Sequence, residues 1–237
     1  MTVTDQYHHT AAIVTGASSG IGRAIAVALA AEGCHVYLVG RQMDSLEVAA
    51  AGLSGSSSIV VADISNDLGI AAVARCCPPT VDFLVHSAGI FHRGAVADTP
   101  SGTFDEIQAV NYRAPLLLTA ACLPALRSAR GQIVFINSTA ALSLGNSTGA
   151  YAASKCALKS AVDAMRREMK GSGIRMLSIY PGRTDTPMQQ RVLLAEGRLN
   201  EHVPLLQPAD VAAVTLTSLR TPRRIEVTDI VIRPCNQ

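Results

Sequence analysis

Residues 11–32 read A-A-I-V-T-G-A-S-S-G-I-G-R-A-I-A-V-A-L-A-A-E, and they identify the architecture of the whole chain. A short apolar run, 11–14, leads into a glycine-rich turn, and the helix-length segment 21–32 follows it. Glycines allow a ligand to approach the backbone closely. The N-terminus of the next helix offers free N–H groups and a positive dipole end to a pyrophosphate. The order strand, glycine turn, helix therefore predicts a dinucleotide-binding unit.

The turn has the glycine spacing G-x-x-x-G-x-G, which differs from the G-x-G-x-x-G of the general dinucleotide fingerprint. An ordinary glycine-rich turn is the alternative. The strand before the turn and the amphipathic helix after it favour phosphate binding. The residues expected to contact the cofactor here are Gly16, Ser18, Ser19, Gly20, Ile21 and Gly22.

Short apolar runs continue to alternate with helix-length segments along the chain. Strands are expected at 11–14, 35–39, 58–62, 81–86, 132–136, 175–179 and 226–232. Helices are expected at 21–32, 43–53, 66–76, 104–127, 150–170 and 209–219. Strict alternation with continuously apolar strands implies right-handed crossovers and a parallel sheet covered on both faces. The predicted fold is α/β, a Rossmann-type doubly wound parallel sheet of about seven strands.

No change in composition divides the chain, so we expect a single domain over residues 1–237. Residues 1–10 lack the pattern of a signal peptide and are expected to form a flexible tail. Residues 187–206 mix leucines with Gln, Arg and Glu, which is typical of a mobile substrate loop or lid.

The bulk composition argues against several classes of function. The net charge is only +2 and both signs are interspersed, so we expect no nucleic-acid partner and no anionic membrane surface. No apolar run reaches the ~18 residues of a membrane span. The six cysteines show no C-x-x-C spacing, and no set of His, Cys and carboxylates has metal-ligand spacing. These features predict a reduced, cytoplasmic protein without a metal.

The end of the second expected strand bears on the choice between NAD and NADP. Folds that take NAD place an acid there to bind the ribose 2′-hydroxyl. Here Gly40-Arg41 follows the strand, and Arg41 can bind a 2′-phosphate through charge-assisted hydrogen bonds. The alternative is a solvent-facing arginine. We predict NADP(H) in preference to NAD(H).

Two further strand ends carry candidate cofactor contacts. Asp63, followed by Ile64, ends the third strand and could accept a hydrogen bond from the adenine amino group. A capping role at the β-α junction is equally compatible with Asp63. After the fourth strand, Ser87, Ala88 and Gly89 form a small-residue turn at the sheet edge where open α/β sheets bind ligands.

Tyr151 and Lys155 lie four residues apart in an expected helix and therefore share one face. A nearby positive charge favours a phenolate, so Lys155 is expected to lower the pKa of Tyr151. Ser138, just past the fifth strand, could complete a proton-transfer site. Three unrelated surface or capping residues are the alternative. A nucleophilic serine is disfavoured because Asn137-Ser138-Thr139 is not a G-x-S-x-G elbow.

Taken together, these motifs resemble the short-chain dehydrogenases/reductases, in their single-domain branch. The matching residues run in the family's order over about residues 11–232: Thr15-Gly16-x-x-x-Gly20-x-Gly22, Asp63, Ala88-Gly89, Asn111, Ser138, Tyr151-x-x-x-Lys155 and Pro181-Gly182-x-x-x-Thr186.

The resemblance implies a role for each catalytic position. Tyr151 would be the general acid in reduction and the base in oxidation, and Lys155 would also bind the nicotinamide ribose. Ser138 would polarise the substrate oxygen, and Asn111 would place a water that relays protons through Lys155. Thr186 would bind the nicotinamide carboxamide. The segment that includes Pro181, Gly182 and Thr184 would complete the cofactor site, and Gly40-Arg41 is similar to the family's NADP-preferring pattern.

Where the family usually has Asn-Asn-Ala-Gly, this chain has His86-Ser87-Ala88-Gly89. We expect Ser87 to be tolerated because it is small and can hydrogen-bond. The end of the chain resembles a subgroup that oxidises small hydroxy acids and related alcohols.

Substrate contacts are expected in residues 91–93, 140–148 and 188–206. Arg183 could bind a substrate carboxylate, although an arginine near an active site is at least as often in a salt bridge.

The predicted function is therefore hydride transfer between NADP(H) and a carbonyl or secondary alcohol of a small molecule. The family resemblance implies a homo-oligomer, a tetramer or a dimer. The alternative function is a non-catalytic NADP(H)-binding sensor or scaffold protein of the same fold, but such a protein would be expected to have lost Tyr151 or Lys155.

Overall fold

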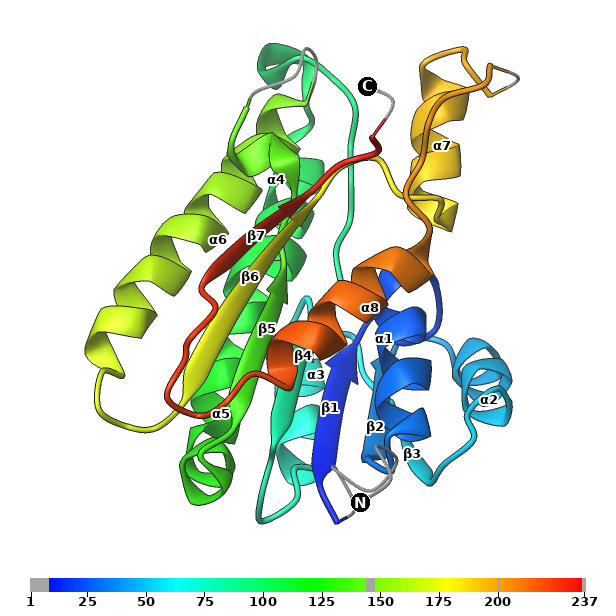
Figure 1. Cartoon of the computed structure of the whole chain (residues 1–237). Coiled ribbons are helices and arrows are strands. Elements are labelled where there is room, and N and C mark those ends of the chain that lie inside the picture. Colours follow the sequence, from blue (N-terminus) through cyan, green and yellow to red (C-terminus); the bar gives the residue numbers. More distant parts are fainter. Residues whose placement is uncertain (1–8, 144–147, 200, 236–237) are drawn as a thin grey trace.

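A computed structural model describes residues 9–143, 148–199 and 201–235. Within these residues, seven strands form one parallel sheet in the order β3-β2-β1-β4-β5-β6-β7 (Figure 1). The strands are β1 (Ala11–Thr15), β2 (His35–Gly40), β3 (Ser57–Val61), β4 (Phe83–His86), β5 (Gln132–Ile136), β6 (Arg175–Pro181) and β7 (Asp229–Ile232). The predicted fold class is confirmed.

Helices connect successive strands and cover both faces of the sheet. They are α1 (Gly20–Ala31), α2 (Met43–Ala51), α3 (Asp67–Arg75), α4 (Ser101–Gln108), α5 (Ala114–Ala129), α6 (Gly149–Glu168), α7 (Pro187–Ala195) and α8 (Pro208–Leu219). Two 3₁₀ turns, η2 (Val96–Asp98) and η4 (Thr139–Ala141), and a π-helical turn, η3 (Ala109–Arg113), complete the described elements.

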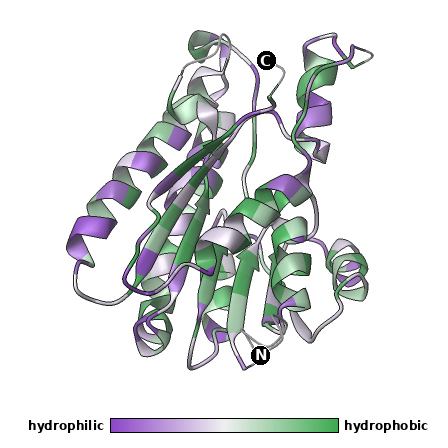
Figure 2. Cartoon of the chain, in the orientation of Figure 1, coloured by the Kyte–Doolittle hydropathy of each residue, from purple (hydrophilic) through white to green (hydrophobic). Residues whose placement is uncertain are grey.

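The two faces of the sheet form two hydrophobic layers because side chains alternate along each strand. On one face, Val14 packs with α1, α2 and α8. On the other face, Ile13 packs with α3, α5 and α6. Every residue of β5 and β6 is buried, which explains why these strands are apolar without alternation. Figure 2 shows the hydrophobic strands between helices whose outer sides are more hydrophilic.

Two expected elements differ from the structure. The helix expected at 104–127 is interrupted by the π-helical turn η3, which separates α4 from α5. The expected range runs through this turn because α4, η3 and α5 are all helical and follow one another without a gap. The segment 187–206, expected as a loop or lid, begins with the helix α7. Only Leu193 of α7 is buried, so the helix lacks the apolar face that sequence patterns detect.

The strand order reverses between β1 and β4, and this crevice is where open α/β sheets bind ligands. Thr15, buried at the end of β1, holds the two strand ends together. Its hydroxyl donates to the carbonyl of Val85 at 3.3 Å. The same oxygen accepts from the backbone N–H groups of Ser87 and Ala88 at 3.1 and 3.2 Å. The glycine turn after β1 and the small-residue turn after β4 are thereby fixed side by side.

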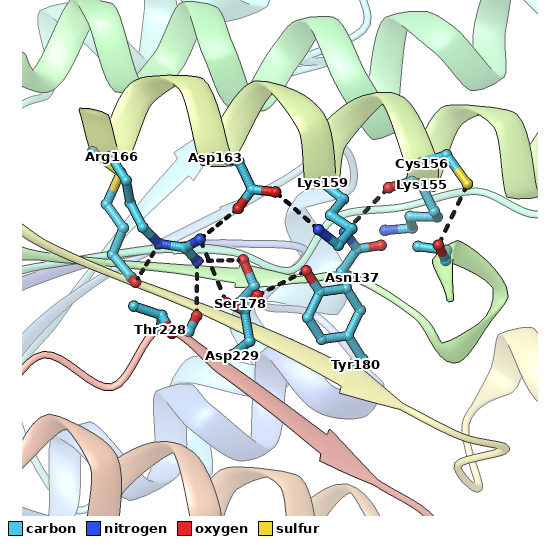
Figure 3. A network of polar contacts seen from close by, with 12 residues as sticks. Asn137, Lys155, Cys156, Lys159, Asp163, Arg166, Ser178, Tyr180, Thr228 and Asp229 are labelled. Carbon is cyan, nitrogen blue, oxygen red and sulfur yellow. Dashed lines mark hydrogen bonds and ion pairs between the residues drawn. The ribbon is translucent and has the colours of Figure 1, made fainter. Parts of the chain in front are cut away.

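Arg166 anchors α6, the helix that carries Tyr151 and Lys155, against the sheet (Figure 3). Its guanidinium donates to the carbonyls of Met176 and Thr228 at 3.2 and 2.7 Å, and to the Ser178 hydroxyl at 3.1 Å. It also pairs with Asp163 at 2.7 Å. The Arg166 side chain is only 13% exposed, and its partners Met176 and Ser178 are buried, whereas its bond to Thr228 lies at the surface.

We expect Arg166→Ala to lower the free energy of unfolding by about 3 kcal/mol or more, because it leaves buried acceptors unpaired. The adjacent Arg167 is exposed, so Arg167→Ala should change stability by less than about 0.5 kcal/mol. Urea unfolding of both variants measures the difference. Equal effects of the two substitutions would show that the network does not hold α6.

Candidate active site

A cavity of about 380 Å³ opens at the carboxyl ends of β1 and β4, on the crevice where the strand order reverses. Most of the cofactor-binding residues predicted from the sequence line it: Gly16, Ser18, Ser19, Gly20, Ile21, Gly22, Arg41, Asp63, Ile64, Ser87, Ala88, Gly89, Tyr151, Lys155 and Thr186. Predicted residues outside this lining are Asn111, Ser138, Pro181, Gly182 and Thr184.

The turn that follows β1 forms part of the cavity wall, and its backbone conformation requires glycine. Gly16 has φ of +68°, and a Cβ placed there would lie 2.8 Å from the backbone of Ala88. Gly20 also has a positive φ, of +54°. The absence of side chains at these positions keeps the cavity open along the N-terminus of α1. Its shape and backbone N–H groups suit the phosphates of a dinucleotide.

Asp63 and Arg41 line the far end of the cavity. The Asp63 carboxylate accepts from the backbone N–H of Ser65 at 3.0 Å, and this bond is the main reason that its pKa is lowered. Asp63 therefore stabilises the turn after β3, whereas Asn66 caps α3 by accepting from the N–H of Gly69. Arg41 is exposed, and its charge also lowers the pKa of Asp63.

Tyr151 and Ser138 meet at the end of β5. The Ser138 oxygen accepts from the N–H of Ala140 at 3.1 Å, and its hydroxyl also hydrogen-bonds with Tyr151. Phe91 lies edge-on to the Tyr151 ring, with the ring centroids 5.0 Å apart. Burial raises the pKa of Tyr151 above its usual value, and the bond with Ser138 acts in the opposite direction. The phenol is thus protonated at neutral pH.

Lys155 is almost fully buried, and its Nζ donates to the carbonyl of Ile136 at 3.0 Å. Burial lowers its pKa from 10.5 to about 8. The Nζ atom lies 5.9 Å from the centroid of the Tyr151 ring. The expectation that Lys155 lowers the pKa of Tyr151 is therefore corrected: burial of the phenol raises this pKa, and the opposing effect comes from the hydrogen bond with Ser138 and not from Lys155.

Asn111 lies in the π-helical turn η3, a type of turn often found at functional sites. Its amide exchanges two hydrogen bonds with the backbone of Ile90, at 2.8 and 2.9 Å, and donates to the Ser154 hydroxyl at 3.1 Å. A Cβ at Gly89 would lie 3.4 Å from Asn111 Oδ1 and 3.8 Å from Lys155 Nζ. The turn after β4, η3 and α6 therefore converge beside the cavity.

His86 and Ser87, the two positions where this chain differs from the usual Asn-Asn-Ala-Gly, have separate structural roles. His86 is buried, stacks on Phe135 and shares a 2.9 Å hydrogen bond with Thr119. Burial lowers the pKa of His86 to about 3, so the ring is neutral at physiological pH. Ser87 lines the cavity, and its hydroxyl lies against Gly22.

The predicted residues after β6 mostly shape the turn. Gly182 donates its N–H to the carbonyl of Ile232 at 2.8 Å, and the Thr184 hydroxyl donates to the carbonyl of Gly182 at 3.1 Å. Thr186 caps α7 by accepting from the N–H of Gln189 at 3.1 Å. Its methyl group lies against Gly20, which brings the start of α7 to the cavity. Arg183 forms a salt bridge with Glu196.

Sequence reasoning did not single out Gln42 and Asn137, which line the cavity. Arg191 also lines it and falls within the segment 188–206, where substrate contacts were expected. Arg191 comes from α7, and Thr186-Pro187 was the available signal for this helix, as an N-cap followed by proline at the first position. Asn137 is buried, accepts from the N–H of Ser138 at 2.9 Å and donates to the carbonyl of Lys155 at 3.2 Å. It links the end of β5 to α6, as Figure 3 shows for its contact with Lys155.

Two further findings concern the described residues alone. None of their helices is both long and apolar enough to cross a bilayer. Among the described residues, no group of three or more His, Cys, Asp or Glu side chains is arranged to hold a metal ion. Parts of three predicted segments lie outside the described residues: positions 1–8 of the tail, 144–147 of the substrate loop 140–148, and 200 of the segment 187–206.

Known proteins resemble this chain over nearly its whole length. The family model for the short chain dehydrogenases matches residues 10–197. An uncharacterized oxidoreductase of Staphylococcus aureus is 30% identical over 228 residues, covering 94% of this chain and 96% of that protein. A glycine betaine reductase of Emericella nidulans is 33% identical over 234 residues. That alignment covers 94% of this chain but only 18% of the larger protein.

Solved structures agree with these sequence relationships. An alcohol dehydrogenase from the archaeon Thermococcus sibiricus, in complex with 5-hydroxy-NADP, superposes with a TM-score of 0.86 at 25% identity, covering 96% of this chain and 97% of that chain. Several other similar structures hold NADP.

Proposed function

This chain belongs to the short chain dehydrogenase family of oxidoreductases, and from that premise we propose that it transfers a hydride between NADP(H) and a carbonyl or secondary alcohol of a small molecule. The observation that carries the proposal is the arrangement of Tyr151 and Lys155 on the wall of the glycine-lined cavity, with Ser138 hydrogen-bonded to the phenol.

The residues present fit a nicotinamide dinucleotide. The cavity runs from Arg41 and Asp63, past the side-chain-free turn at Gly16 and Gly20, to Tyr151. The turn and the N-terminus of α1 would hold the pyrophosphate, and Arg41 the 2′-phosphate. Thr186 would contact the nicotinamide end. When bound, the cofactor supplies the hydride, and the protein contributes binding, orientation and proton delivery.

Tyr151 is the proposed general acid in the reducing direction. Its raised pKa keeps the phenol protonated at neutral pH, which is the form that can donate to a substrate oxygen. Ser138 would hydrogen-bond the same substrate oxygen and hold it beside the phenol. Lys155, with a pKa of about 8, is mostly protonated at pH 7 and supplies a positive charge on the same helix face. We place Asn111 as a positioning residue, because its side chain joins Ile90 to Ser154.

The preference for NADP(H) can be tested at Arg41. Arg41→Asp should lower the ratio of NADPH affinity to NADH affinity by about tenfold or more, because an acid repels the 2′-phosphate and binds a free 2′-hydroxyl. Cofactor fluorescence titrations measure both affinities. Arg75→Asp makes the same charge change on an exposed site of α3 and should leave the ratio unchanged. An unaltered NADPH-to-NADH affinity ratio in Arg41→Asp would contradict the assignment of Arg41 to the 2′-phosphate.

A non-catalytic NADP(H)-binding sensor or scaffold is the second candidate. The retained and buried Lys155, together with the Ser138–Tyr151 bond, favours catalysis, since a sensor has no need of a proton donor. The two proposals differ in one assay: tight NADPH binding without turnover on any of a panel of ketones, keto acids and sugars would favour the sensor. We further propose a cytoplasmic location, as the cysteine pattern suggests, and a homo-oligomer, as the family resemblance implies.

A further inference from the structure

Arginines from separate segments converge on Glu196, at the C-terminal end of α7. Arg183 binds its carboxylate with both terminal nitrogens, at 2.8 Å each. Arg93 contacts the same carboxylate at 2.8 Å. A third arginine, Arg198, is 3.9 Å from Glu196 but pairs with Glu201 at 2.6 Å. Arg93 and Arg183 thus share a single counter-charge.

The two arginines come from loops that follow the two strands flanking β5, and their guanidinium groups meet at Glu196. Arg93 follows β4 and Arg183 follows β6, and β5, which leads to Ser138, lies between those strands. Phe91, two residues before Arg93, contacts the Tyr151 ring. Gly94, one residue after Arg93, bridges to Thr148 just before α6. The guanidinium pair therefore belongs to the loops that surround the proposed substrate position.

The charges in this cluster do not balance. Two guanidinium groups face one carboxylate, whose pKa is lowered, mainly by its hydrogen bonds from Arg183, so that it stays ionised. The local charge is therefore about +1. Each guanidinium has five N–H donors, and Glu196 takes two from Arg183 and one from Arg93. The Arg93 and Arg183 side chains are 35% and 31% exposed, so both remain accessible from the loops.

We propose that the substrate carries a carboxylate, and that Arg93 and Arg183 recognise it while Glu196 aligns the two guanidinium groups. Planar carboxylates match the guanidinium donor geometry, and an anion would neutralise the remaining charge. This inference rests on the proposed oxidoreductase function and narrows its substrate class to keto acids or hydroxy acids.

The test compares each acid with its own methyl ester, which keeps the carbonyl and removes the charge. Pyruvate, acetoacetate and levulinate place the carboxylate progressively farther from the ketone. With NADPH, we expect kcat/KM for at least one acid to exceed that of its ester by tenfold or more. A ratio of one or below for all three pairs would overturn the inference. Turnover of the esters in that case would leave the proposed function standing.

Variants locate the effect in the guanidinium pair. Arg183→Gln and Arg93→Gln should each lower the acid-to-ester ratio toward one, mainly through KM of the acid. Arg183→Lys keeps the positive charge but lacks the planar guanidinium that can donate two parallel hydrogen bonds, so it should give an intermediate acid-to-ester ratio. Arg198→Gln is the matched control, because Arg198 pairs with Glu201, and should keep the ratio within about twofold of the wild type. A ratio that is unchanged in both Arg93→Gln and Arg183→Gln would contradict the assignment.

A binding measurement covers the case in which neither acid nor ester is turned over, which would count against the proposed function itself. Calorimetric titration of acetoacetate or levulinate into the protein saturated with NADP⁺ should show binding by the wild type and at least tenfold weaker binding by Arg183→Gln. If neither acid binds the wild type, the inference is wrong.

Discussion

Replacing Tyr151 with phenylalanine should lower kcat by a factor of about 10²–10⁴, the range typical of a lost general acid. The substitution removes one oxygen and retains the ring that packs edge-on against Phe91. It therefore removes the proton that a substrate oxygen would receive without opening the site. Steady-state NADPH oxidation with an accepted carbonyl substrate measures the loss.

The binding of cofactor separates a chemical defect from a structural one. NADPH affinity of Tyr151→Phe should stay within a few-fold of the wild type, since the glycine turn and Arg41 are unaltered. Tyr37→Phe is the matched control, because Tyr37 lies on β2 and does not line the cavity. It should keep full turnover. Near-normal turnover in Tyr151→Phe would mean that another group delivers the proton.

Replacing Lys155 with methionine should also remove most turnover, by about 10² or more, because it deletes the cation expected beside Tyr151. Unlike Tyr151→Phe, it should weaken NADPH binding as well, since Lys155 lines the cavity and is proposed to bind the nicotinamide ribose. Turnover and fluorescence titration together measure the two effects. If Lys155→Met kept both normal turnover and normal NADPH affinity, Lys155 would have no role in the active site.

Although Lys155→Met should lower turnover, it should raise the free energy of unfolding at neutral pH, and this gain should depend on pH. Burial lowers the pKa of Lys155 from 10.5 to about 8, so the folded protein binds this proton more weakly than the unfolded chain. The resulting penalty, about 3 kcal/mol, is complete below pH 8 and disappears as pH rises to 10.5. Lys155→Met lacks this penalty.

The stability of the variant relative to the wild type should therefore fall as pH rises from 8 to 10.5. Urea unfolding of both proteins at several pH values measures the difference, and other titrating groups cancel because both proteins share them. A difference that does not change over this range would show that the lysine is not held as a desolvated ammonium.

Much of this architecture could be predicted from the sequence because local patterns dictate it. The continuously apolar strands and the glycine turn at Gly16 identify a parallel sheet with a phosphate-binding crevice, and the structure brings Arg41, Ser87 and Tyr151 to one cavity. These residues follow strand ends or lie on a helix facing the sheet, so strand order alone places them together.

What could not be predicted depends on contacts between distant segments. The salt bridges of Glu196 with Arg93 and Arg183 join residues separated by up to about a hundred positions, and no local pattern marks them. The rise in the pKa of Tyr151 depends on how deeply the phenol is buried, which spacing from Lys155 does not reveal. The helix α7 was missed because its exposed faces are not periodic in hydrophobicity.

The most direct test of hydride transfer uses NADPH that carries deuterium at one or the other hydrogen of the reactive nicotinamide carbon. The protein is incubated with a carbonyl substrate that it accepts, and the alcohol product is analysed by mass spectrometry. We predict that one of the two labelled cofactors, and only one, transfers a single deuterium to the carbinol carbon, and that Tyr151→Phe slows this transfer. Bound NADPH with no deuterium in any product, across the whole carbonyl panel, would contradict the account.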